Sequence, residues 1–152
     1  MLLTTERAVL LLTDLQERLM PAIYDGEVVV ARAVRLAEAA RLLGVPVRAT
    51  EQYPAGLGPT VPALAAYPQA VLTKTSFSAA EDPDFSALLP DGASEIVVAG
   101  CEAHVCVLQT VLGLLGRGHR VAVAAREQAE HGLQDADVRL APGHDHLGGP
   151  GG

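Results

Sequence analysis

The chain has 152 residues, enough for one domain with a single hydrophobic core, and 49% of them are apolar while only 3% are aromatic. Its net charge is −7 and its 11 basic residues are scattered, which disfavours a nucleic-acid partner, because binding a phosphate backbone needs clustered Lys and Arg. No stretch approaches the roughly 20 apolar residues of a membrane-spanning helix, so we expect no membrane partner.

Aliphatic runs predict buried strands in the first half of the chain. Ala8–Thr13 reads AVLLLT; the apolar run is short, lacks a basic region before it and ends in Thr13-Asp14, so we do not expect a signal peptide. Apolar positions at helical spacing predict a helix over Val28–Leu43, ended by Gly44. Further strands are predicted at Val45–Thr50 and Ala70–Thr73.

The second half continues the alternation of strands and helices. Ile96–Ala99 is the clearest buried strand, His104–Leu115 reads as a helix, and Val121–Ala125 as a fifth strand. Such alternation predicts an open, doubly wound parallel sheet. We expect one domain over residues 1–125 and an irregular or partly disordered tail over residues 126–152, where apolar positions are sparse.

In doubly wound sheets ligands bind beyond the carboxyl ends of the strands. Asp14, Glu51–Tyr53, Lys74 and Gly100–Cys106 each follow a predicted strand, so we expect them to converge at one edge. The long segment Glu51–Pro68 is rich in Pro and Gly, and loops of such length are usually functional or mobile.

Cys106 is the candidate nucleophile because it lies in the first turn of the predicted helix, where the helix dipole and unpaired N–H groups favour a thiolate. A buried structural cysteine is the alternative. Cys101 and Cys106 are the only cysteines, too few for a disulfide framework or a zinc site, and a reducing cytoplasm is the expected location.

Asp14 and Lys74 are the candidates to act beside this thiol. Asp14 is either the N-cap of the next helix or an acid of the site. Lys74 is the only lysine in the chain, which is suggestive because Arg replaces Lys freely on surfaces but not where a compact ammonium is needed. His104 could pair with Cys106, but side chains two residues apart on a helix diverge, so we expect it at the edge of the site.

The segments LLLTDLQERLMPAI, ATEQYPAGLGPTVPAL, TKTSFS and VVAGCEAHVCVLQTVLGLLGRGHRV resemble the isochorismatase-like cysteine hydrolase family, most closely its isochorismatase domain-containing subgroup. The resemblance covers most of residues 8–123. It implies a Rossmann-like, three-layer α/β/α fold with a mostly parallel sheet of five or six strands, here with shortened C-terminal elements.

The same resemblance implies a catalytic triad of Asp14, Lys74 and Cys106. It also implies a cis peptide between Cys101 and Glu102, with the N–H groups of Glu102 and Cys106 forming an oxyanion hole. The residues that we expect to contact substrate are Gln16, Tyr53, Leu57, Phe77 and His104. Nicotinamidase relatives carry zinc on an Asp-x-His pair, which this chain replaces by Glu51-Gln52-Tyr53, so we expect no metal and no cofactor.

The leading hypothesis is hydrolysis of a small-molecule amide or related C–N bond through a thioester. A vinyl ether hydrolase of the isochorismate type is an alternative that does not need the cysteine, and an idle oligomeric binding protein is another. We also expect a homo-oligomer, a dimer or tetramer, in which Gly113 and Gly116 permit close approach of the predicted helix that follows Cys106.

Overall fold

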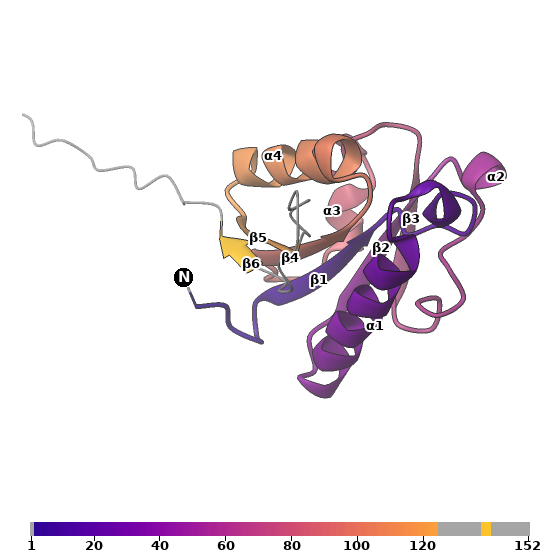
Figure 1. Ribbon diagram of the computed structural model, residues 1–152. Helices are drawn as coiled ribbons and strands as arrows, with labels where there is room; N and C mark the ends of the chain where they lie inside the picture. Colours follow the sequence, from indigo (N-terminus) through magenta and orange to yellow (C-terminus); the bar gives the residue numbers. More distant parts are fainter. Residues whose placement is uncertain (1, 125–137, 141–152) are drawn as a thin grey trace, which may run out of the picture.

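The computed structural model describes residues 2–124 and 138–140, and their strands form one sheet in the order β3-β2-β1-β4-β5-β6 (Figure 1). The strands are β1 (Ala8–Thr13), β2 (Val47–Gln52), β3 (Ala70–Lys74), β4 (Glu95–Gly100), β5 (Arg120–Ala124) and β6 (Val138–Leu140). The first five pair in parallel, and β6 pairs antiparallel with β5. The predicted doubly wound, mostly parallel sheet is thereby confirmed, with its reversal of strand order between β1 and β4.

The helices cover both faces of this sheet (Figure 1). The α-helices are α1 (Gly26–Leu42), α2 (Pro54–Leu57), α3 (Phe85–Leu88) and α4 (Leu108–Gly116), and the other helical turns are η1 (Met20–Ala22), η2 (Ala79–Glu81) and η3 (Ala103–Val107). α1 packs on one face, and α3 and α4 pack on the other. Among the described residues, no helix combines the length and apolarity that crossing a bilayer requires.

The central strand β1 explains why the sheet is buried on both sides. All six of its residues are buried. Val9 and Leu11 pack in the core beneath α3 and α4, while Leu10 and Leu12 pack in the core beneath α1. Because successive side chains of a strand point to opposite faces, an unbroken aliphatic run is what a doubly covered parallel strand requires.

Several predicted boundaries differ from the structure by one or two residues. β2 begins at Val47, not at Val45, because the Val45 N–H donates to the carbonyl of Ala40 and so belongs to the C-terminal cap of α1. Gly44 makes that cap possible with φ of 70°. The helix predicted over 104–115 is divided into the π-helical turn η3 and the regular helix α4.

The C-terminal region departs from expectation at one place. Residues 138–140, within the stretch predicted to be irregular, form the edge strand β6. The rest of residues 125–152, including Ala125 and the three histidines of the tail, lies outside the described residues.

A buried carboxylate stabilises the amino-terminal edge of the sheet. Glu95, the first residue of β4, is fully buried and accepts a hydrogen bond of 2.7 Å from the Thr4 N–H. Arg7 and Arg120 reach the same carboxylate at 3.3 and 2.5 Å. This ion cluster ties the N-terminal segment and β5 to β4, at the opposite end of the strands from the residues considered next.

Candidate active site

The carboxyl ends of β1 and β3 bring the two predicted charged residues together. Asp14 follows β1, and Lys74 is the last residue of β3. The Lys74 Nζ lies 2.8 Å from the Asp14 Oδ2, and neither side chain is accessible to solvent. A buried pair of opposite charges at this separation is a strong interaction, and removal of either partner leaves the other charge uncompensated.

Asp14 adopts a backbone conformation that turns its carboxylate into the site. Its φ is 54°, a left-handed value that Asp and Asn tolerate better than most residues. The Thr50 hydroxyl donates to Oδ1 at 2.7 Å, and the Asp14 N–H donates to the Thr50 carbonyl at 3.1 Å. Asp14 does not cap a helix, since the N-cap residue of α1 is Asp25. The capping alternative is therefore excluded.

Lys74 is surrounded by oxygen atoms. Its ammonium donates to Asp14 and, at 2.7 Å, to the Gln52 Oε1. The backbone carbonyls of Ser76 and Phe77 lie at 3.2 and 3.3 Å. Four acceptors around three N–H donors satisfy the ammonium fully, which explains how a cation is accommodated here without contact with water.

Cys106 lies in η3 and is buried beside this pair. The Asp14 carboxylate and the Glu102 backbone N–H both lie near enough to its sulfur to affect the pKa of the thiol. Burial, followed by the charge of Asp14, raises the pKa of the Cys106 thiol to about 11, although Lys74 acts in the opposite direction. The expectation that the helix terminus favours a thiolate is therefore wrong for the resting site, which holds a protonated thiol.

The loop before Cys106 contains a cis peptide bond between Cys101 and Glu102, at the position that the family resemblance implies. The Glu102 carbonyl accepts hydrogen bonds from the N–H groups of Val105 and Val107, which anchor the loop to η3. Gly100 leaves no room for a side chain, since a Cβ there would overlap the Thr13 carbonyl. β4 consequently approaches the end of β1 closely where the loop begins.

Cys101 belongs to the core and not to the reacting groups. Its sulfur lies 3.8 Å from the Met20 sulfur, within the core beneath α1. Burial raises the pKa of the Cys101 thiol to about 11. The two cysteines are both free thiols.

Gln16, which the resemblance implies as a substrate contact, makes its hydrogen bonds within the protein. Its side chain is fully buried, and the Oε1 accepts from the Gln52 N–H at 2.8 Å. Its Nε2 donates to the carbonyls of Gln52 and Gly58 at 2.9 and 2.7 Å. With these bonds Gln16 joins the loop after β1 to the loop after β2, and no polar hydrogen is left for a substrate.

The other residues expected to contact substrate have different degrees of exposure. Tyr53 and Phe77, which follow β2 and β3, are 59% and 62% exposed, and Leu57 is half-buried in α2. The His104 side chain is 82% exposed and lies 3.9 Å from the Glu102 carboxylate. This exposure agrees with a place at the edge of the site and disfavours a Cys–His pair.

The segment that corresponds to the zinc-binding pair of nicotinamidase relatives is occupied by protein contacts. The Glu51 Oε1 accepts hydrogen bonds from the Thr60 N–H and hydroxyl at 2.7 and 2.9 Å. Within residues 2–124 and 138–140, no group of three or more His, Cys, Asp or Glu side chains is arranged to hold a metal ion.

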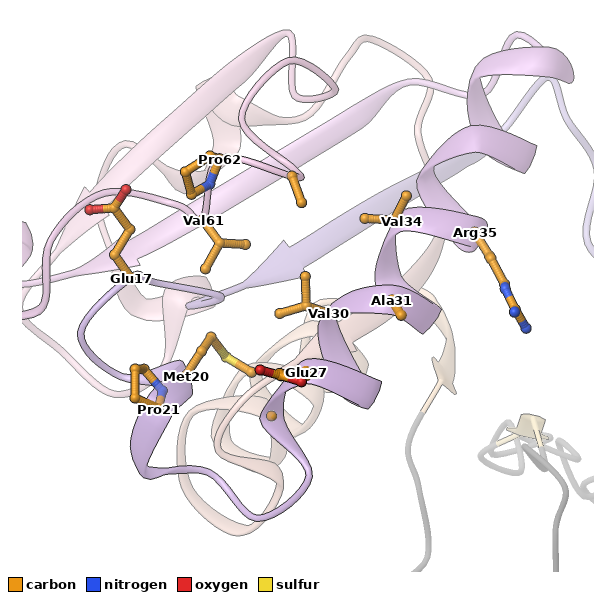
Figure 2. Close-up of a pocket in the computed structure, with 12 residues that line it drawn as sticks. Glu17, Met20, Pro21, Glu27, Val30, Ala31, Val34, Arg35, Val61 and Pro62 are labelled. Atoms are coloured by element: carbon orange, nitrogen blue, oxygen red, sulfur yellow. The ribbon is translucent and has the colours of Figure 1, made fainter.

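A separate hollow of about 700 Å³ lies between α1 and the segment 61–63 (Figure 2). Its lining is mainly apolar, with Met20, Val30, Val34 and Val61 facing the space and Glu17 at its edge. Asp14, Lys74 and Cys106 are not among its lining residues. This hollow is therefore distinct from the place where the candidate reactive groups meet.

The family model and the similar proteins both indicate the same family. The model of the isochorismatase domain family matches residues 8–131. Isochorismatase domain-containing protein 2 of Danio rerio is 42% identical over 134 residues, which are 84% of this chain and 68% of that protein. The chain spans about two thirds of the length of that protein and of isochorismatase domain-containing protein 2A of Mus musculus.

Solved structures agree with this assignment. The MAR1 ribonuclease from Caenorhabditis elegans is 38% identical with a TM-score of 0.73, over 80% of this chain and 64% of that one. The YcaC gene product of Escherichia coli, described as an octameric hydrolase of unknown specificity, has a TM-score of 0.70 at 24% identity, over 80% of this chain and 63% of that one.

Proposed function

This chain belongs to the isochorismatase domain family, and from that premise we propose that it is a cysteine hydrolase that cleaves a small-molecule amide or related C–N bond. The observation that carries this proposal is the buried Cys106 thiol next to the Asp14 carboxylate, which itself holds the buried ammonium of Lys74. A nucleophile, a base in contact with it and a third group that orients the base form the arrangement required for covalent catalysis.

In the proposed reaction, the Cys106 sulfur attacks the carbonyl carbon of the amide while its proton passes to Asp14. The transfer must accompany the attack, because a thiol with a pKa of about 11 is rarely ionised at neutral pH. The C–N bond then breaks, and the amine leaves with the proton from Asp14. Water adds to the resulting thioester and releases the carboxylic acid, and the thiol regains its proton.

The remaining groups stabilise charge in these steps. The Glu102 N–H, which contacts the sulfur in the resting site, and the Cys106 N–H are the donors that we assign to the oxyanion. Lys74 orients Asp14, because its ammonium donates a hydrogen bond of 2.8 Å to that carboxylate and is shielded from water. Tyr53, Leu57, Phe77 and His104 are the residues assigned to contacts with the substrate.

The test is a screen of small amides, carbamates and ureas with detection of the released amine. We expect at least one substrate whose turnover disappears in Cys106→Ser, and an acyl adduct on Cys106 in mass spectra of the acid-quenched reaction. A vinyl ether substrate cleaved equally well by Cys106→Ser would contradict the proposal. Absence of turnover and of any adduct over the whole panel would favour a binding protein that retains the fold.

Nuclease activity is a second candidate, because the similar protein from Caenorhabditis elegans is named a ribonuclease. The net charge of −7 and the saturated ammonium of Lys74 disfavour it, since neither supplies a free cation for a phosphate. Degradation of a labelled RNA by the wild type and not by Cys106→Ser would establish this alternative.

We further propose a homo-oligomer, a dimer or tetramer, in the cytoplasm. Leu108 and Leu112, one turn apart on α4, are 44% and 53% exposed, and apolar stripes of this kind mark contact surfaces. The octameric relative supports association, and two free thiols suit a reducing compartment. Light scattering that shows only a folded monomer of 15.8 kDa would overturn the oligomer.

A further inference from the structure

The Gln52 side chain contacts the Lys74 ammonium, although no role in the site was expected for it. Gln52 lies in the segment Glu51-Gln52-Tyr53, which stands where nicotinamidase relatives carry a zinc site. Its Oε1 accepts a hydrogen bond of 2.7 Å from the Lys74 Nζ, as short as the 2.8 Å bond from Lys74 to Asp14. We propose that Gln52 is a positioning residue, which holds the Lys74 ammonium against Asp14 and thereby sets the reactivity of Cys106.

The amide of Gln52 can present only its oxygen to Lys74. Its Nε2 donates to the Thr75 carbonyl at 2.8 Å, so a rotated amide would lose this bond and direct two N–H groups at an ammonium. Gln52 and Lys74 are also register partners at the ends of β2 and β3, which fixes their separation. The orientation is therefore determined by the contacts on both sides of the amide.

The backbone of Gln52 is held as firmly as its side chain. The buried Gln16 accepts from the Gln52 N–H and donates to the Gln52 carbonyl, at 2.8 and 2.9 Å. A continuous series of hydrogen bonds thus runs from Gln16 through Gln52 and Lys74 to Asp14, which contacts Cys106. Each member has two fixed neighbours, so the position of the ammonium depends on Gln52.

A neutral hydrogen-bond acceptor is favoured over a carboxylate at position 52, beside the Lys74 ammonium. Asp14 and Lys74 compensate each other, and a second carboxylate on Lys74 would leave a buried net negative charge next to the thiol. The groups that act on the thiol are Asp14, Lys74 and the Glu102 N–H, and only Lys74 contributes a positive charge. An ammonium that moves away, or that is shared with a second carboxylate, stabilises the thiolate less.

The inference rests on the proposed function, but its test does not need a substrate. Alkylation of Cys106 by iodoacetamide at pH 9, followed by peptide mapping, reports how easily the thiol ionises. In Gln52→Leu we expect alkylation of Cys106 to be about three- to tenfold slower than in the wild type, since the thiolate has lost part of its stabilisation. With a substrate in hand, we expect kcat to fall at an unchanged KM.

Gln69→Leu is the matched control. The Gln69 Oε1 also accepts two hydrogen bonds, from the Val47 N–H and Arg48, but at the amino end of the same pair of strands. We expect it to lower the melting temperature while the alkylation rate stays at the wild-type value. Equal rates in Gln52→Leu and Gln69→Leu, or faster alkylation in Gln52→Leu as in a loosened site, would overturn the assignment.

Gln52→Glu tests the same idea if Gln52→Leu fails to fold. It retains an acceptor for Lys74 and adds a negative charge, so slower alkylation is again expected, and a rate equal to that of the wild type would count against the proposal. The role of Gln52 and the proposed hydrolase activity can be refuted independently of each other. Slower alkylation without any amide turnover leaves Gln52 assigned and refutes the hydrolase, whereas turnover with normal kcat in both Gln52 variants refutes the role of Gln52.

Discussion

The Lys74 ammonium lies 2.8 Å from the Asp14 carboxylate, and neither group reaches solvent. The Cys106 thiol shares that carboxylate, so one buried anion interacts with both a cation and a neutral proton donor. Asp14 thereby has two opposite effects on the cysteine. Its charge opposes ionisation of the thiol at rest, and its oxygen is placed to accept the proton during attack.

Replacement of Asp14 by Asn should separate these two effects. The substitution removes the negative charge that raises the thiol pKa and retains Lys74, which lowers it, so the pKa of Cys106 should fall. We expect alkylation of Cys106 at pH 8 to become roughly tenfold faster, while amide turnover is lost for want of a base. Slower alkylation would show that the carboxylate is not the group that controls this thiol.

The two cysteines should respond differently to replacement by serine. Cys106→Ser should abolish turnover with little change in the circular dichroism spectrum, because a hydroxyl is nearly isosteric but a far weaker nucleophile. Cys101→Ser should retain most activity, since that sulfur contacts Met20 in the core. Equal loss in the two variants, measured as kcat/KM, would instead indicate that the cysteines act as a pair.

Stability should fall at alkaline pH because both thiols are harder to ionise in the folded state. Their pKa values are raised to about 11, above the ordinary value of 9.0, so this stabilisation is fully present below pH 9 and is lost as the pH rises towards 11. The Cys101 thiol contributes at most about 2–3 kcal/mol, and Cys106 contributes less, because solvent screens the less deeply buried thiol.

Urea denaturation at pH 8, 9 and 10 measures this effect against a suitable reference. The reference is the double variant Cys101→Ala, Cys106→Ala, which removes both thiols and retains every other group that titrates in the range. We expect the unfolding free energy of the wild type to decline more steeply with pH than that of the double variant. Parallel curves would mean that the thiols are not perturbed by folding.

The two glycines of α4 should give opposite results on replacement by alanine. A Cβ at Gly113 would lie 2.7 Å from the Ala80 Cβ and 3.2 Å from the Ser78 Oγ, whereas nothing lies within 4 Å of a Cβ at Gly116. We expect Gly113→Ala to destabilise the fold by about 1–2 kcal/mol through overpacking. Gly116→Ala should stabilise it by up to about 1 kcal/mol through helix propensity. Thermal denaturation of the two variants side by side decides the point.

Gly113 is therefore explained within the chain itself. The close packing expected at Gly113 is made within the chain, because Ala80 of η2 occupies the space beside it. The sequence could not reveal this neighbour, since Ala80 is 33 positions away and belongs to a turn with no clear periodicity.

The strands and the positions of the charged site residues could be predicted, because the sequence pattern of each is compatible with only one structure. The aliphatic runs of β1 and β4 identify strands buried on both faces, and the carboxyl ends of parallel strands place Asp14 and Lys74 at one edge. The state of Cys106 could not be predicted in this way. It depends on the burial of the sulfur and on its contact with Asp14, both of which arise from the path of the 101–106 loop.

Gln16 and Gln52 show a second kind of feature that could not be predicted from the sequence. Gln16 follows β1 and Gln52 ends β2, and both strands were predicted near their observed positions, so the general place of the two residues was predictable. Their roles depend on which polar atoms face each other across loops 36 residues apart, and this is set by the side-chain hydrogen bonds between the two loops. A polar residue next to a catalytic candidate is thus as easily a support for the site as a part of its lining.

The Glu95 cluster gives the molecule a second buried carboxylate with a quite different environment. Glu95 meets two guanidinium groups and a backbone N–H at the amino edge of the sheet, whereas Asp14 meets one ammonium and a thiol at the carboxyl edge. Deep mutational scanning, scored once for cellular abundance and once for turnover, would therefore separate the variants at one end of the strands from those at the other end. Variants around Glu95 would lose both scores together, and conservative variants around Asp14 would lose turnover while the protein still accumulates.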